Sequence, residues 1–204
     1  MSLLVITTPA TNTALATRAY VKGELSIADN SEDARIDAYI AQASAAIAGW
    51  CGRVFARETV TETFRLTSPI ALDHLVLRRF PVVSIVSVVE DGTSLDAADY
   101  EVNTESGVLF RLSGDDLSSW CATKIVVSYT AGYSLPNSAP EALQRACVDL
   151  VSYYRSSAGR DHSLRSESLD GVDSASYFDG AGERGGLPPA VAGLLQQFQT
   201  PSFW

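Results

Sequence analysis

Two long stretches of the chain repeat apolar residues with the period of a helix. In residues 30–52 the apolar positions alternate in steps of four and three, which places them on one side of a helix. Asn30 or Ser31 would cap its start, and Gly52 would end it. A second, wider stripe over residues 140–154 begins with proline, which suits the first helical position. The pattern therefore predicts a helix in each stretch.

Two shorter helices are predicted nearer the ends of the sequence. A weaker apolar stripe spans about residues 13–25 and would be capped by Asn12 or Thr13. Near the C-terminus, Pro188 and Pro189 open a last short helix. The apolar residues on one side of this last helix are Val191, Leu194, Leu195 and Phe198.

Between the two long helices the pattern changes to that of short strands. Alternating residues rich in Thr and Val begin after Gly52, and Asp91-Gly92 is a strong hairpin turn signal. The segments lie too close together for crossover helices, so we expect an antiparallel sheet. The strand candidates are residues 59–66, 72–80, 82–90, 100–103, 108–112 and 124–130.

A long polar segment, residues 155–186, follows the second long helix. It is rich in Ser, Gly, Asp and Arg, too polar to form a core and too long for an ordinary loop. Tyr177 and Phe178 are unusual inside it, and Phe203 and Trp204 raise the same question at the C-terminus. These aromatic residues either fold back on their own core or dock on a neighbouring copy of the chain.

The order of elements predicts an α+β fold. We expect a small helical bundle formed by residues 1–159, with an antiparallel β lobe inserted at about 56–133. Residues 160–204 would form a long C-terminal arm with a short helix. The two long helices should pack together, with Trp50 and Leu150 buried, because each apolar stripe is too wide to stay in water.

Composition and charge narrow the class of protein. Apolar residues make up 46% of the chain, enough to build a core, and the net charge is -9. An acidic chain does not hold the nucleic-acid backbone but lets DNA slide past. Residues 1–9 are apolar but lack the basic region of a signal peptide, and no apolar run is long enough to span a membrane. Arg78 and Arg79 are interpreted first as strand-edge charges, although they and Lys22 could face partners.

The sequence contains no recognisable catalytic motif. His74 is expected to be a solvated or hydrogen-bonded strand residue, and His162 an exposed residue of the polar segment. The acidic pairs Asp115–Asp116 and Asp170 with Asp173 are expected to form turns, because neither has the spacing of a calcium loop. We therefore expect no catalytic residue, no metal and no cofactor.

The cysteines give no sign of a disulfide framework or a zinc site. Their number is odd and they lie far apart, with no Cys-x-x-Cys pair. We expect them to be small buried side chains of a protein made in a reducing cytoplasm. They are Cys51, Cys121 and Cys147.

Several stretches, taken in order, make the chain resemble a known family, the head-tail connector (adaptor) proteins of tailed phages, including those of prophages and gene transfer agents. The resemblance covers nearly the whole chain, and the Gly-rich run at residues 179–186 departs from it. It rests on Val5-Ile-Thr-Thr-Pro9 with Tyr20-Val-Lys22 and Leu25-Ser-Ile27, Trp50-Cys-Gly-Arg53, Leu77-Arg-Arg-Phe-Pro81, Asp91-Gly92, Val127-Ser-Tyr-Thr-Ala-Gly-Tyr133, Pro140-Glu-Ala-Leu143, Arg165-Ser-Glu-Ser168 and Leu187-Pro-Pro189.

The resemblance implies a structural role rather than a catalytic one. Such a protein forms a ring, commonly of twelve copies, below the portal of the virion. The ring extends the DNA channel without binding DNA specifically and docks the stopper or tail-completion protein. The protein would be made in the cytoplasm of the host bacterium. Candidate interface residues are Tyr177, Phe178, Leu187, Phe198, Phe203 and Trp204.

Two other classes of function stay open from the sequence. A small β lobe on a helical base suits a non-catalytic module that binds a peptide or a sugar. A small hydrolase is the more distant alternative. A concave site whose titrating groups have strongly shifted pKa values would favour an enzyme.

Overall fold

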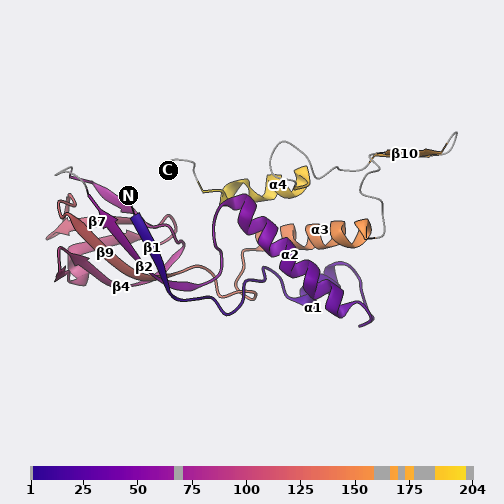
Figure 1. Cartoon of the computed structure of the whole chain (residues 1–204), viewed down its shortest axis with the longest axis horizontal. Coiled ribbons are helices and arrows are strands. Elements are labelled where there is room, and N and C mark those ends of the chain that lie inside the picture. Colours follow the sequence, from indigo (N-terminus) through magenta and orange to yellow (C-terminus); the bar gives the residue numbers. More distant parts are fainter. Residues whose placement is uncertain (1, 67–70, 159–165, 170–172, 177–186, 201–204) are drawn as a thin grey trace. The chain divides into compact units, whose positions relative to one another are not determined.

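The protein is described from a computed structural model, which covers residues 2–66, 71–158, 166–169, 173–176 and 187–200 (Figure 1). The chain forms two compact units, and each unit is assembled from two separate stretches of sequence. The first, here called the β unit, comprises Met1–Asn12 and Val54–Leu135. The second, the helical unit, comprises Thr13–Arg53 and Pro136–Trp204.

The β unit contains two antiparallel sheets. The larger sheet has five strands in the order β1-β2-β9-β4-β5, and the smaller has the order β3-β7-β6 with β8 also paired to β7. The larger sheet is formed by β1 (Ser2–Thr8), β2 (Glu58–Arg65), β4 (Val82–Glu90), β5 (Thr93–Ser94) and β9 (Lys124–Ala131). The smaller is formed by β3 (His74–Val76), β6 (Tyr100–Asn103), β7 (Val108–Ser113) and β8 (Asp116–Ser118), with a short 3-10 turn, η1 (Ala97–Asp99), before β6.

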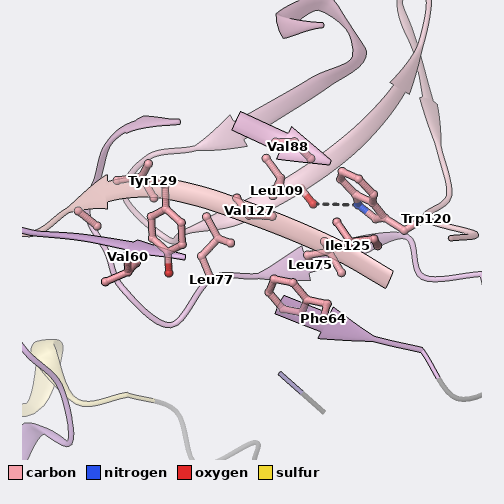
Figure 2. Close-up of a cluster of buried hydrophobic side chains, with 12 residues drawn as sticks. Val60, Phe64, Leu75, Leu77, Val88, Leu109, Trp120, Ile125, Val127 and Tyr129 are labelled. Atoms are coloured by element: carbon pink, nitrogen blue, oxygen red, sulfur yellow. Dashed lines mark hydrogen bonds between the residues drawn. The ribbon is translucent and has the colours of Figure 1, made fainter. Parts of the chain in front are cut away.

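The core of the β unit lies between the two sheets (Figure 2). Alternation along β2 and β9 turns every second side chain toward this core. Leu75 and Leu109 of the smaller sheet meet Ile125 and Val127 of the larger one in the same cluster. Trp120 is fully buried there, and its indole Nε1 donates a hydrogen bond to the carbonyl oxygen of Leu109 at 3.3 Å. The two sheets therefore form a sandwich with one outward face each.

The helical unit is built around two long helices that pack on each other, as predicted. Leu150 is 1% exposed, which confirms its predicted burial, whereas Trp50 is only half-buried. A short C-terminal helix packs on the second long helix and buries Val191 and Leu195. The helices are α1 (Arg18–Glu24), α2 (Asp33–Cys51), α3 (Glu141–Ser157) and α4 (Pro189–Leu195), followed by a 3-10 turn, η2 (Gln196–Phe198). With the antiparallel sheets, they confirm the α+β class and the helical bundle with an inserted β lobe.

Helix ends differ from the predicted ones. α1 begins at Arg18 and is capped by Thr17, whose hydroxyl accepts the backbone N–H of Tyr20 at 3.1 Å. The predicted cap at Asn12 or Thr13 is therefore wrong. α2 is preceded by Glu32 rather than Asn30 or Ser31, and it ends as predicted at Gly52, whose left-handed backbone suits glycine.

Some strands were not predicted. β1 pairs antiparallel with β2, although residues 2–8 show no alternation of polar and apolar side chains. The described part of the polar segment contains a small antiparallel hairpin of β10 (Ser166–Leu169) and β11 (Asp173–Ser176). The pairing of β1 is not visible in the local hydrophobic pattern, because an edge strand buries too little to impose one.

Candidate interaction surface

The outward side of the larger sheet carries hydroxyl groups in register across its strands. Thr61 Oγ1 lies 3.0 Å from Ser128 Oγ and 3.3 Å from Thr7 Oγ1, and Thr59 Oγ1 lies 3.0 Å from Thr130 Oγ1. We call this side the hydroxyl face. Its residues are Leu3, Val5 and Thr7 of β1, Arg57, Thr59, Thr61, Thr63 and Arg65 on or just before β2, Val83, Ser84, Val86, Ser87 and Val89 of β4, and Lys124, Val126, Ser128 and Thr130 of β9.

Apolar side chains flank the hydroxyls on both sides. Leu3 and Val5 of the edge strand β1 are 66% and 54% exposed. On β4, Val83 and Val86 are exposed at the two positions where the register with β9 shifts. A bulge leaves one residue without a partner in the ladder, which explains why these valines stand out from the sheet. Exposed β-branched residues on one face indicate a surface that contacts another molecule.

The charges of the hydroxyl face are all positive. None of the chain's acidic residues is among its outward side chains, which include Arg57, Arg65 and Lys124. Arg65 and Lys124 are direct partners across the ladder, an arrangement that costs stability without a counter-charge. Among the described residues, none of the three forms an ion pair. Asp91, in the turn after β4, accepts hydrogen bonds from the backbone N–H groups of Thr123 and Lys124.

The other arginines of the β unit are neutralised within it. Arg79 Nε lies 3.3 Å from Glu58, and Arg111 Nε lies 3.2 Å from Glu90. Arg78 Nε lies 3.9 Å from Glu62. The three cations of the hydroxyl face are therefore distinct from the paired cations elsewhere in the unit.

A buried polar cluster lies on the inward side of the same sheet. Glu62 is fully buried, and its Oε2 accepts hydrogen bonds from the Tyr129 hydroxyl at 3.0 Å and the Arg78 backbone N–H at 3.1 Å. The Tyr129 hydroxyl also accepts the backbone N–H of Arg79 at 3.1 Å. Burial, and then the neighbouring Glu62, raise the pKa of Tyr129 far above its usual range. The cluster fastens the segment after β3 to the sheet.

This cluster corrects the interpretation of Arg78 and Arg79 as strand-edge charges. The side chains of both lie close to carboxylates of β2. Their backbone N–H groups donate hydrogen bonds to Glu62 and to the Tyr129 hydroxyl. Glu58 and Glu62 were not predicted, because an alternation of Thr and Glu has two polar sides and does not show which one is buried. The adjacent cations Arg78 and Arg79 were the feature of the sequence that could have indicated two buried carboxylates nearby.

Two of the hollows lined by described residues lie on the β unit. One, of about 280 Å³, is lined by residues 8–12, 57–59 and 133–135 together with Thr130, and adjoins Arg57 at one end of the hydroxyl face. The other, of about 310 Å³, surrounds Arg111, which ion pairs with Glu90 and with Asp99 at 3.7 Å. The guanidinium of Arg111 in this second hollow is therefore already paired with two carboxylates.

The predicted interface residues fall into two groups. Leu187 is 9% exposed and belongs to the core of the helical unit, which leaves it little surface for a partner, and Phe198 is half-buried. Tyr177, Phe178, Phe203 and Trp204 lie outside the described residues. His74 is exposed on β3, with its ring 6.0 Å from that of Phe110, as expected of a solvated strand residue.

The cysteines are all free, but not all are buried. Cys51 and Cys147 are buried as expected, and burial raises the pKa of each thiol to about 11. Cys121 is exposed, which contradicts the expectation for that residue. It lies in the connection between β8 and β9.

Within the described ranges, no cluster of three or more His, Cys, Asp or Glu side chains could hold a metal ion. A search of the same ranges finds no helix with the length and apolar character needed to cross a membrane.

Comparison with known proteins identifies the fold and the family. No curated protein sequence matches the chain. The structure is similar to a chain in the neck of an empty gene transfer agent (GTA) particle computed with C6 symmetry, with a TM-score of 0.57, 18% identity, and coverage of 97% of this chain and 95% of that one. It is also similar to a chain in the virion of a native GTA particle (TM-score 0.57, 19% identity) and to one in the neck of a native GTA particle computed with C12 symmetry (TM-score 0.54, 19% identity), with the same coverage.

A family model described as "Head completion protein" matches residues 14–198, a span that takes in the four α-helices and, apart from β1, the strands of the described residues. On that match, the chain belongs to the head completion protein family.

Proposed function

We propose that the chain works as one subunit of a ring below the portal of a tailed phage or a phage-like particle. The chain is a structural head-tail connector subunit, and the observation that carries this is the head completion family match over residues 14–198. Similar folds in GTA necks computed with C6 and C12 symmetry support a ring, with twelve copies as the expected number.

The ring would extend the DNA channel without gripping DNA. The chain has a net charge of -9, which every copy in the ring repeats. The described cations of α1, α2 and α3 each lie near a carboxylate. Arg18 and Lys22 lie 2.9 and 2.7 Å from Asp33, Arg35 and Arg155 lie 3.9 and 2.8 Å from Glu32, and Arg145 lies 3.1 Å from Glu24. Lys22 is therefore held inside the helical unit rather than presented to a partner. Cations occupied in this way do not displace the counter-ions of a duplex.

The expected partners are other copies of the chain, the portal protein and the stopper or tail-completion protein. The C-terminal arm, residues 160–204, is the proposed docking segment, with Tyr177, Phe178, Phe203 and Trp204 as its aromatic anchors. We propose no catalytic residue and no cofactor. The protein would be made in the host cytoplasm and retained in the virion.

Deletion of the gene in a producing strain tests this proposal. We expect DNA-filled heads without attached tails, and restoration of complete particles when the full-length chain is supplied in trans. Electron microscopy of purified particles should then show the chain in a ring at the neck. Normal tailed particles without the gene would refute the proposal.

A further inference from the structure

The outward face of the smaller sheet carries charges of the opposite sign to the hydroxyl face. Glu101 points outward on β6, because its neighbour Val102 pairs with the buried Leu109. The flanking turns add the exposed carboxylates of Glu105 and Asp115. Phe110 and the 70% exposed Leu117 also lie on this side. We call it the acidic face.

Among the described residues, no lysine or arginine forms an ion pair with these carboxylates. The one cation on the described strands of the smaller sheet is Arg111, which turns inward to Glu90 and Asp99. The β unit therefore has a basic outward face on one sheet and an acidic outward face on the other. Because both belong to one sandwich with a shared core, their relative orientation is fixed.

This polarity suits contact between two copies through different surfaces. If two hydroxyl faces met, Arg65 and Lys124 of one copy would oppose cations of the other, and two acidic faces would repel in the same way. A hydroxyl face against an acidic face pairs opposite charges and covers apolar residues on both sides, Leu3, Val5 and Val86 on one and Leu117 on the other. Such a head-to-tail contact leaves one free face on each copy and closes into a ring when the rotation allows.

The smaller sheet limits the size of the contact. Its strands β3, β7 and β6, spaced about 4.8 Å apart and at most six residues long, present roughly 15 by 20 Å. Both partners together would bury roughly 600 Å², the size of a weak contact, which a ring strengthens by repetition. In a closed ring each subunit makes this contact with both of its neighbours. The ring is therefore more stable than the modest affinity of a single pair.

We propose that the hydroxyl face of one subunit docks on the acidic face of its neighbour, so that the β units form a continuous belt. This inference rests on the ring of the proposed function and names the surfaces that build it. The partner is a second copy of this chain, recognised by carboxylates that meet Arg57, Arg65 and Lys124.

Charge reversal of the full-length chain tests the contact. The variant Arg65→Glu with Lys124→Glu should weaken self-association at least about tenfold, as should Glu101→Lys with Glu105→Lys. The variant with all four changes has the wild-type net charge and pairs opposite signs again, so its association should return to within about threefold of wild type. Sedimentation velocity over a concentration series measures this, and near-ultraviolet circular dichroism checks that each variant is folded.

Crosslinking tests the head-to-tail arrangement. In a Cys121→Ser background, Thr61→Cys and Leu117→Cys place one thiol on each face, and Cys51 and Cys147 are too buried to react. A bis-maleimide should link the double variant into trimers and longer ladders, while either single variant stays monomeric. Dimers from Thr61→Cys alone would show a symmetric contact and overturn the inference.

Two further outcomes would also overturn the inference, and they separate it from the proposed function. In the first, wild-type rings form while charge reversal leaves self-association unchanged and the double-cysteine variant gives no crosslinked species. The proposed contact surfaces are then wrong, although the chain still forms a ring. If the wild-type chain stays monomeric even at about 100 µM, the direct contact of faces fails. The gene-deletion experiment then decides the connector role independently.

Discussion

Removal of one hydroxyl group, by Tyr129→Phe, should destabilise the β unit by about 2–4 kcal/mol. The hydroxyl donates to the fully buried carboxylate of Glu62 at 3.0 Å and accepts the backbone N–H of Arg79 at 3.1 Å. A hydrogen bond to a charged group contributes about 1.5–3 kcal/mol and a neutral one about 0.5–1.5 kcal/mol. Glu62 would keep one of its two bonds, since its other oxygen, Oε1, has no hydrogen-bond partner.

Urea unfolding measures this loss. Trp120 is buried in the same core, so its fluorescence reports the β unit when Trp50→Phe and Trp204→Phe remove the other indoles. Tyr133→Phe removes the same atom from a half-buried tyrosine of the same unit and should change the free energy of unfolding by less than about 0.5 kcal/mol. Equal effects of the two substitutions, or a loss below about 0.5 kcal/mol for Tyr129→Phe, would refute a stabilising role of the cluster.

Other predictions concern the helical unit, the thiols and DNA. Leu150→Ala should cost about 2–5 kcal/mol in urea unfolding because its side chain is 1% exposed, whereas Leu117→Ala, at an exposed leucine, should cost little under monomeric conditions. Native protein should incorporate one equivalent of a thiol reagent at Cys121, and Cys51 and Cys147 should react only after unfolding. The folded-state pKa of these two buried thiols, about 11, exceeds the unfolded value of 9.0. Their contribution to stability should therefore be complete below pH 9 and be lost as the pH rises to about 11. Urea unfolding at a series of pH values measures this loss. The free protein should bind duplex DNA poorly at physiological salt. Submicromolar, salt-sensitive binding in a fluorescence titration would contradict a channel wall that does not bind DNA.

The long helices and the inner strands were predictable because burial leaves a repeating pattern. β4 matches its predicted span of 82–90, and the packing of α2 on α3 follows from two stripes that need cover. β1 could not be predicted because an edge strand has one neighbour, and its outward Leu3 and Val5 interrupt any alternation. Its pairing depends on β2, more than fifty residues away in the chain.

The interaction surface was largely invisible in the sequence for a related reason. Thr59, Thr61 and Thr63 are polar in any local window, and only the register with Ser128 and Thr130 turns them into a connected face. The opposition of Arg65 and Lys124 is likewise a property of pairing rather than of spacing. The pattern of the C-terminal arm pointed instead to its aromatic residues and to Leu187, and Leu187 is buried in the chain's own core.

The interleaving of the two units constrains how the chain folds during synthesis. Ser2 is made first but pairs with Phe64, and Glu58 pairs with Ala131, so the larger sheet stays incomplete until most of the β unit has left the ribosome. α2 waits longer, because its partner α3 follows the whole β unit. Such separations slow folding and leave apolar strand edges exposed in the nascent chain. Rapid overexpression should therefore favour aggregation, and slower translation at low temperature should increase the soluble yield.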